Sequence, residues 1–193
     1  MLIPDALHHG ERGVLDYDAK GTVVTSFWPV IFNNINEAEQ LISYGIKELS
    51  ADQDRIAVMG HSMGGFSSAG IFVKYPNLKT VININGSFSY AHTESLMLEA
   101  LGGYDVTQEH VEELKLYDPM YYLGALAQRP VLIVHGEQDQ VVPIGGQEYF
   151  FNEVQEIYKD IPDNIKFVRY PRVNHYITVQ MIEEILLWLY EKL

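Results

Sequence analysis

The sequence contains no cysteine, and this absence excludes several kinds of chemistry. Without thiols the chain can form no disulfide, no thiolate metal site and no cysteine nucleophile. This composition suits a reducing compartment, so we expect a cytoplasmic protein. Long apolar segments are also missing, and residues 1–5 lack the basic and apolar parts of a signal peptide. We therefore expect no membrane-spanning helix.

Basic residues are scarce as well. Lys and Arg total 13 against 26 Asp and Glu, which gives a formal net charge of -13. A negative field of this size repels phosphate backbones and anionic lipid surfaces, so we expect neither nucleic acid nor a membrane as a partner. The remaining composition, with 47% hydrophobic residues in a chain of 193, is that of an ordinary globular protein with a sizeable core.

Hydrophobic periodicity predicts the fold class. Short apolar runs rich in β-branched residues predict strands at residues 56–59, 80–84, 130–135 and 165–170, and residues 1–5 resemble the end of another. Segments with apolar residues at helical intervals predict helices at residues 25–49, 66–75, 145–158 and 177–193. Pro29 falls near the start of the first of these helices, where proline is tolerated. The alternation predicts an α/β fold, with a mostly parallel sheet covered by helices on both faces.

Residues 1–193 contain no linker or repeat, which predicts a single domain. Residues 89–128 depart from the alternation, because they hold no strong strand and predict two or three short helices. We interpret them as a cap-like helical insertion that covers the strand ends. Aromatic residues in and beside it are candidates for lining a pocket, although ordinary packing also accounts for them: Phe88, Tyr90, Tyr104, Tyr117, Tyr121 and Tyr122.

Ser62 is the candidate nucleophile. It lies in the run Gly60-His61-Ser62-Met63-Gly64-Gly65, between a predicted strand and a predicted helix. A Gly-x-Ser-x-Gly turn in this setting holds the serine in a strained backbone conformation that exposes its hydroxyl. We expect a side chain at either Gly60 or Gly64 to clash, because the strand and the helix pass closely there.

A serine hydroxyl needs a general base, and the base needs an acid to orient it. Asp139 follows the strand at residues 130–135, and His175 follows the strand at residues 165–170. Active sites of parallel sheets lie at the carboxyl ends of the strands, so we expect both side chains near Ser62. The chain order Ser, Asp, His is the order of this architecture.

Other polar residues offer alternatives for these roles. Weaker candidates for the acid are Asp105, Asp118 and Glu137. Residues near the expected strand ends also invite a metal site: His8, His9, Glu11, His61 and His135. Their spacing matches no recognised ligand motif such as His-Glu-x-x-His, so we expect no bound metal.

Together these motifs resemble the α/β-hydrolase superfamily. The resemblance rests on the serine turn, on His135-Gly136-Glu137-Gln138-Asp139 with Val142-Pro143, and on Asn174-His175. The opening residues 4–12 resemble the fourth-strand region of its small bacterial esterases, in the branch close to dienelactone hydrolases and prolyl-oligopeptidase-type catalytic domains. The resemblance implies a serine hydrolase that cleaves a small-molecule carboxylic ester without a cofactor. Ser62 would be the nucleophile, His175 the base, Asp139 the orienting acid, and the backbone N–H of Met63 an oxyanion donor.

The chain departs from this family in one respect. The family's sheet has three earlier strands and a His-Gly loop that supplies half of the oxyanion hole, and residues 1–193 contain no such segment ahead of the first strand. We therefore expect an N-terminally truncated form of the fold with an empty central position in the sheet. Three explanations are open: the chain is a fragment or late-start product, the strand at residues 1–6 shifts sideways, or a second copy fills the gap. Because an unpaired edge at residues 56–59 favours association, we expect a dimer or higher oligomer built near this edge. The alternative function is a catalytically weak or inactive domain that binds a small molecule or a protein.

Overall fold

The computed structural model describes residues 1–14, 22–100, 102–103 and 105–193. At its centre lies a sheet of four parallel strands in the order β1-β2-β3-β4. The strands are β1 (Ala57–His61), β2 (Thr80–Ile84), β3 (Val131–Gly136) and β4 (Ile165–Tyr170). The predicted parallel sheet is confirmed, and β2 and β4 have the predicted bounds.

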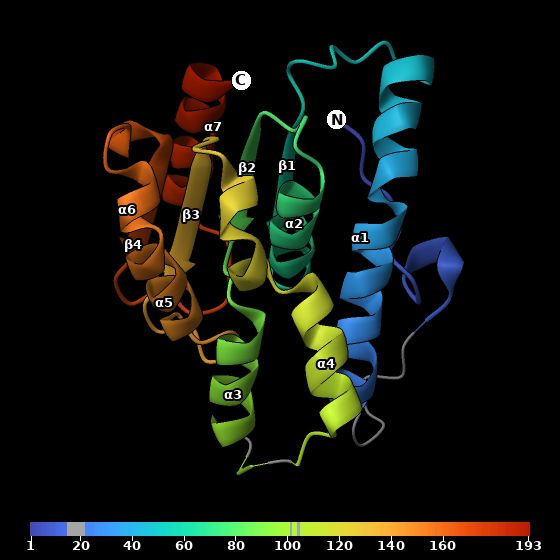
Figure 1. Cartoon of the computed structure of the whole chain (residues 1–193), viewed down its shortest axis with the longest axis vertical. Helices are drawn as coiled ribbons and strands as arrows, with labels where there is room; N and C mark the ends of the chain where they lie inside the picture. Colours follow the sequence, from blue (N-terminus) through green and yellow to red (C-terminus); the bar gives the residue numbers. More distant parts are fainter. Residues whose placement is uncertain (15–21, 101, 104) are drawn as a thin grey trace.

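Helices connect the strands and cover the sheet (Figure 1). They are α1 (Thr22–Glu48), α2 (Met63–Lys74), α3 (Tyr90–Ala100), α4 (Gln108–Tyr117), α5 (Gly145–Glu153), α6 (Gln155–Tyr158) and α7 (Val179–Lys192), with the 3-10 helices η1 (Gly10–Arg12), η2 (Pro119–Leu126) and η3 (Pro162–Asn164). Within the described residues, each helix is too short or too polar to cross a lipid bilayer.

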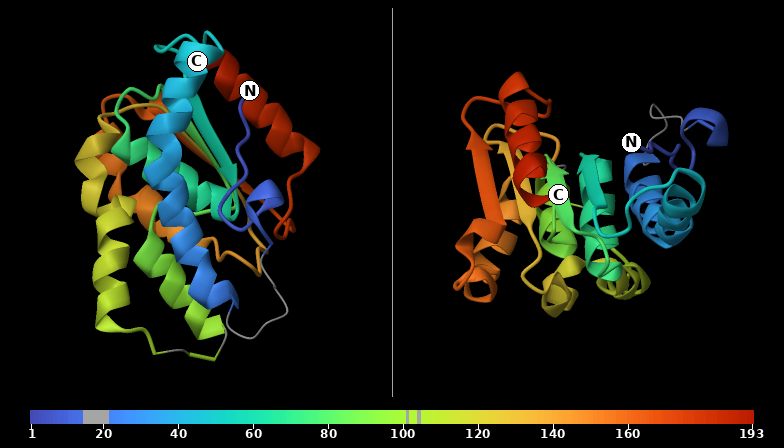
Figure 2. Two further views of the ribbon diagram at one scale, coloured as in Figure 1. Left: turned by 90° about the vertical axis from the view of Figure 1, so that its right-hand side faces the viewer. Right: turned by 90° about the horizontal axis from the view of Figure 1, so that it is seen from above.

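The side chains of β3 alternate between two cores. Val131 and Ile133 belong to the larger core, which includes residues of α1, α2 and α5. Leu132 and Val134 belong to a smaller core with residues of α7. Successive strand residues point to opposite faces, so a strand buried on both faces must be apolar throughout. Figure 2 shows α7 (red) on one face of the sheet and α2 (teal) and α6 (orange) on the other, with α1 (blue) beside α2.

Helix α1 begins earlier than the sequence predicts, and this changes the place of Pro29. The prediction put Pro29 near the start of a helix that begins at residue 25, but α1 begins at Thr22 and Pro29 lies inside it. Proline lacks the N–H that would bond to the carbonyl of the preceding turn. The Pro29 side chain itself is exposed.

Residues 1–5 form no strand, so the prediction of a strand end there is wrong. Their apolar side chains are largely exposed. Residues outside the sheet bind the segment instead, because the Asp5 carboxylate accepts the Glu11 N–H at 2.9 Å. The next residue, Arg12, is in turn held to α1, where its guanidinium donates to Glu37 at 2.6 and 2.8 Å. A short apolar run does not specify strand pairing by itself, because pairing depends on cross-strand and buried neighbours.

The segment at residues 89–128 contains the predicted short helices, namely α3, α4 and η2. Helix α3 follows β2 and packs against α5 at the carboxyl edge of the sheet (Figure 1). At the end of α4, Tyr117 stacks on Phe32 of α1 with ring centroids 4.1 Å apart. The division into one domain with a cap-like insertion stays a prediction.

Strand β1 lies at an edge of the sheet, since only β2 pairs with it in the described part of the chain. Met59 on this strand exposes 48% of its surface. Helix α7 also exposes apolar side chains along one stripe: Val179, Ile182, Leu186 and Tyr190. Unpaired strand edges and apolar patches favour association.

A dimer or higher oligomer stays a prediction. We expect sedimentation velocity to detect a dimer or larger species, and a monomer at every concentration would contradict it.

Candidate active site

Ser62 lies at the sharp turn between β1 and α2. Its backbone has φ 56° and ψ -123°, in a region that residues other than glycine rarely adopt. Backbone hydrogen bonds hold this turn: the Ser62 N–H donates to the Ile84 carbonyl at 2.9 Å, and the Gly65 N–H donates to the Ser62 carbonyl at 2.8 Å. The strained backbone that the sequence predicts for this serine is therefore present.

Two glycines permit the close approach at this turn, and one of them is not the predicted one. A Cβ at Gly60 would lie 1.8 Å from the Gly64 carbonyl oxygen, and a Cβ at Gly65 would lie 2.8 Å from the Gly86 Cα. A Cβ at Gly64 would meet no atom within 4 Å. The prediction is correct for Gly60 and wrong for Gly64, because Gly64 faces open space while Gly65 faces the chain that leaves β2.

We expect Gly60→Ala to lower the free energy of unfolding by roughly 2–4 kcal/mol, because the added Cβ meets backbone atoms that cannot move without opening the turn. Gly64→Ala is the matched control. We expect its free energy of unfolding to stay within about 1 kcal/mol of the wild-type value, because the new methyl group meets no neighbour. Urea unfolding of the two variants measures the difference, and equal values would contradict the close approach at Gly60.

The three predicted catalytic side chains lie together at the carboxyl edge of the sheet. His175 Nε2 is 2.8 Å from Ser62 Oγ, and His175 Nδ1 is 2.7 Å from Asp139 Oδ2. A carboxylate oxygen only accepts hydrogen bonds, so Nδ1 of His175 carries the proton and Nε2 presents its lone pair to the serine hydroxyl. This is the arrangement that a general base acting on serine requires.

Asp139 is buried and accepts hydrogen bonds at both oxygens. Oδ1 accepts the N–H groups of Val141 and Val142 at 2.9 and 2.8 Å, and Oδ2 accepts from His175, with His135 Nε2 at 3.4 Å. Burial by itself would raise the pKa of Asp139, but the hydrogen bonds from His135, His175 and the two backbone groups outweigh it and hold the pKa well below its usual range. Asp139 is therefore ionised at neutral pH and able to stabilise a cation on His175.

The loops after β3 and β4, which carry Asp139 and His175, pack closely against each other. A Cβ at Gly136 would lie 2.4 Å from the carbonyl oxygen of Val173. The Asn174 side chain joins the same two loops, because its Oδ1 accepts the N–H of Gln140 at 3.0 Å and the N–H of His175 at 2.8 Å. The acid and the base are thus held at a fixed spacing.

Asn85, directly after β2, is a site residue that the sequence analysis misses. Its Oδ1 accepts the Gly136 N–H at 3.0 Å, and its Nδ2 donates to the Tyr176 carbonyl at 3.3 Å. Nδ2 also lies 3.4 Å from His61 Nε2. Its φ of 44° is a conformation that asparagine adopts more readily than most residues. The available signal was Asn-Gly directly after a buried strand, which predicts a turn but not these contacts.

His61 packs beside the candidate base. The ring centroids of His61 and His175 are 4.9 Å apart, with the planes inclined by 34°. Burial and the neighbouring His175 lower the pKa of His61. His61 is therefore neutral at neutral pH and adds no charge that would oppose a cation on His175.

The backbone N–H of Met63 lies directly after Ser62, at the N-terminus of α2. It donates to no other group in the part of the chain that the structure describes. The positive end of the helix dipole and free N–H groups at this position favour a negative charge. The role of Met63 as an oxyanion donor stays a prediction.

The weaker candidates for the acid make other contacts or face solvent. Asp118 accepts the N–H groups of Ala91 and Met120 at 2.9 and 3.0 Å, so it joins the start of α3 to η2, and burial raises its pKa. Asp105 and Glu137 are exposed. Among the described residues, no group of three or more His, Cys, Asp or Glu side chains is arranged to hold a metal ion.

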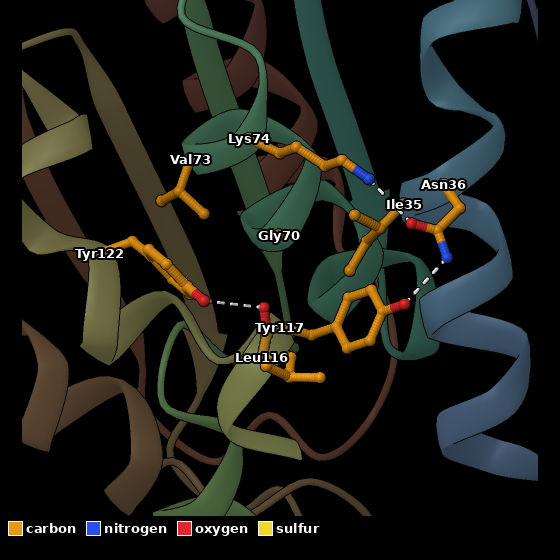
Figure 3. A pocket seen from close by; sticks show the side chains of 8 residues that line it. All are labelled: Ile35, Asn36, Gly70, Val73, Lys74, Leu116, Tyr117 and Tyr122. Atoms are coloured by element: carbon orange, nitrogen blue, oxygen red, sulfur yellow. Dashed lines mark hydrogen bonds between the residues drawn. The ribbon is translucent and has the colours of Figure 1, made fainter. Parts of the chain in front are cut away.

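A pocket of about 340 Å³ lies between α1, α2, α4 and η2 (Figure 3). It is lined by Ile35, Asn36, Gly70, Val73, Lys74, Leu116, Tyr117 and Tyr122. Tyr117 and Tyr122 are thus the aromatic candidates that line it, whereas Phe88 and Tyr90 are buried in the core. Tyr121 is exposed, and Tyr104 lies outside the described residues. The pocket includes none of the three predicted catalytic residues.

Comparison with known sequences yields two relatives that are named as esterases. The chain is 30% identical over 182 residues to "Putative esterase YitV" of Bacillus subtilis (strain 168), a match that covers 90% of this chain and 71% of that protein. It is 27% identical over 148 residues to "Esterase YjfP" of Escherichia coli (strain K12). That second match covers 74% of this chain but only 58% of the relative.

Solved structures show the same architecture. TT1662 from Thermus thermophilus superposes with a TM-score of 0.75 at 18% identity, over 97% of this chain and 74% of that chain. A truncated form of a carbohydrate esterase from gut microbiota superposes with a TM-score of 0.64 at 18% identity, over 86% of this chain and 70% of that chain. At this level of identity the likeness concerns the fold, which is the predicted α/β-hydrolase fold.

The family model described as the prolyl oligopeptidase family matches residues 33–193, which is most of the chain. This match and the relatives named as esterases support a hydrolase activity. By the extent of the family match and the identity to its relatives, the chain belongs to the prolyl oligopeptidase family.

Proposed function

We propose that this protein is a serine hydrolase that cleaves carboxylic esters through an acyl-enzyme. The observation that carries the proposal is the continuous chain of hydrogen bonds from Asp139 through His175 to Ser62, with contacts of 2.7 and 2.8 Å. The strained turn at Ser62 adds support, because it presents the hydroxyl at the end of a buried strand. The names of the two relatives favour esters over other acyl compounds.

In the first half of the reaction, Ser62 Oγ attacks the ester carbonyl carbon while His175 Nε2 takes the hydroxyl proton. The carbonyl oxygen becomes an oxyanion, and the Met63 N–H is the donor expected to bind it. When the tetrahedral intermediate collapses, the bond to the alcohol oxygen breaks. The leaving alcohol takes the proton from His175, and the acyl group remains on Ser62.

In the second half, water attacks the acyl-enzyme and His175 takes its proton. Collapse of this intermediate releases the carboxylic acid and returns the proton to Ser62 Oγ. Asp139 stays ionised throughout and stabilises the cation that forms on His175 in each half. The cycle requires no cofactor, and its substrates are a small-molecule ester and water.

A fluorophosphonate probe tests the proposal directly, because it reacts with activated serine hydroxyls. We expect mass spectrometry of the digested protein to find the label on the peptide that contains Ser62. Ser62→Ala and the heat-denatured wild-type protein are the controls, and neither should be labelled. A native protein without label on Ser62 would overturn the proposal.

Turnover of p-nitrophenyl acetate completes the test. We expect the labelled wild-type protein to lose its esterase activity in proportion to the label on Ser62. Labelling without any ester turnover would contradict the esterase proposal, and would favour a hydrolase-like domain that binds its ligand without cleaving it.

A further inference from the structure

His135 is a buried histidine that the proposed mechanism does not use. It belongs to β3, between Val134 and Gly136, and its relative exposure is 0%. Its Nε2 lies 3.0 Å from the Val142 carbonyl oxygen and 3.4 Å from Asp139 Oδ2. Both of these oxygens can only accept hydrogen bonds, so Nε2 of His135 carries a proton.

The other ring nitrogen of His135, Nδ1, lowers the stability of the folded state. Nδ1 is buried and has no hydrogen-bond partner among the described residues. A buried polar atom without a partner destabilises the folded state, whereas an apolar residue at the same place would avoid this cost. The preceding residues of β3 are all buried and apolar. We therefore look to the contacts of Nε2 for the reason that a histidine occupies this position.

The contacts of Nε2 concern the orientation of the Asp139 carboxylate. Two backbone N–H groups, from Val141 and Val142, bind Oδ1, and they leave Oδ2 for side-chain donors. His175 Nδ1 is one such donor, at 2.7 Å. The His135 Nε2–H bonds to the Val142 carbonyl at 3.0 Å and makes a longer, secondary contact with Oδ2 at 3.4 Å. Because the His135 N–H is shared with the Val142 carbonyl, it also ties the carboxylate to the backbone of the loop that carries it.

We propose that His135 is a positioning residue for the reaction: its Nε2–H holds Oδ2 of Asp139 in the orientation that directs His175 toward Ser62. The inference rests on the proposed function, since it concerns the same three side chains. His135 has no exposed surface on which a substrate could bind, and the proposed reaction moves no proton to or from it. It acts only through Asp139.

Two substitutions separate this role from simple packing. His135→Gln keeps an N–H donor near the position of Nε2, whereas His135→Phe keeps a ring but removes the donor. With p-nitrophenyl acetate, we expect His135→Phe to lower kcat by roughly ten- to a hundredfold with KM unchanged, the range for one hydrogen bond to a charged group. We expect His135→Gln to keep kcat within about threefold of the wild-type value.

A spectroscopic measurement extends the test to a protein without ester turnover. The proton between His175 Nδ1 and Asp139 is expected to give a downfield proton NMR signal in the wild-type protein. We expect the signal to persist in His135→Gln and to broaden in His135→Phe, because a less constrained carboxylate lets this proton exchange faster with water. Circular dichroism shows whether each variant is folded.

The outcomes are distinct. Equal kcat and an unchanged NMR signal in a folded His135→Phe would overturn the positioning role, as would an equal loss in a folded His135→Gln. If the wild-type protein cleaves no ester at all, the proposed function fails, and the NMR comparison still decides whether His135 holds Asp139 in place. If His135→Phe does not fold, then His135→Leu takes its place, because it lacks the donor and has a smaller volume.

Discussion

Replacing Ser62 with alanine is expected to lower kcat for a p-nitrophenyl ester by roughly 10⁵- to 10⁶-fold. The variant has no oxygen with which to form an acyl-enzyme, so only direct attack by water on a bound ester remains. KM should change little, because the methyl group of alanine preserves most of the shape of the site. Initial rates with purified protein measure the effect, and a residual rate within tenfold of the wild-type rate would place the nucleophile elsewhere.

A substitution of His175 tests whether this residue and Ser62 act together. His175→Ala should lower kcat about as much as Ser62→Ala, since neither side chain can act without the other. The double variant should therefore be no slower than either single variant. If the two effects instead multiplied in the double variant, Ser62 and His175 would contribute independently, and the 2.8 Å contact between them would not be the catalytic one.

Asp139→Asn is expected to lower kcat by roughly 10⁴-fold while the protein stays folded. The amide can turn its N–H₂ group toward His175, and Nδ1 of His175 then becomes the acceptor. The proton moves to Nε2, which faces Ser62 Oγ at 2.8 Å and can no longer take the hydroxyl proton. An Asp139→Asn variant with near wild-type kcat would mean that another group orients His175.

The stability of the same variant should depend on pH differently from that of the wild-type protein. The pKa of Asp139 is lower in the folded than in the unfolded chain, where it is about 4. Ionisation of Asp139 thus stabilises the fold above that pH, and the stabilisation is lost as the pH falls toward the folded pKa. We expect the wild-type Tm to fall more steeply than that of Asp139→Asn between about pH 5 and pH 3. Parallel curves would contradict the strong pairing of Asp139.

Local sequence patterns predict those parts of the fold that depend on local physics. The strands β2 and β4 have the predicted bounds, because each is rich in β-branched or aromatic residues and has a turn signal on both sides. The serine turn is equally local, since the close approach that requires Gly60 to be glycine is to Gly64, only four residues further along the chain. The positions of Asp139 and His175 follow from a general property of parallel sheets, in which the carboxyl ends of all strands share one edge.

Features that depend on contacts between residues far apart in the chain could not be predicted from local sequence patterns. Residues 1–5 have the composition of a strand end, but no strand accepts them and Asp5 bonds to η1 instead. Gly64 and Gly65 are indistinguishable in the motif, and only the path of the chain at Gly86 shows which of them needs to be glycine. Asn85 contributes to the site through Gly136 and the loop after β4, and neither contact leaves a mark near Asn85 in the sequence.

Because Gly136 lies so close to Val173, the loop after β3 and the loop after β4 cannot move independently of each other. A side chain at Gly136 would push the loops apart and lengthen the 2.7 Å contact between Asp139 and His175. Loops beside an active site are the usual targets when an enzyme is redesigned for a new substrate. Here an exchange of one loop alone would disturb the triad, so the acid loop and the base loop must be transplanted together.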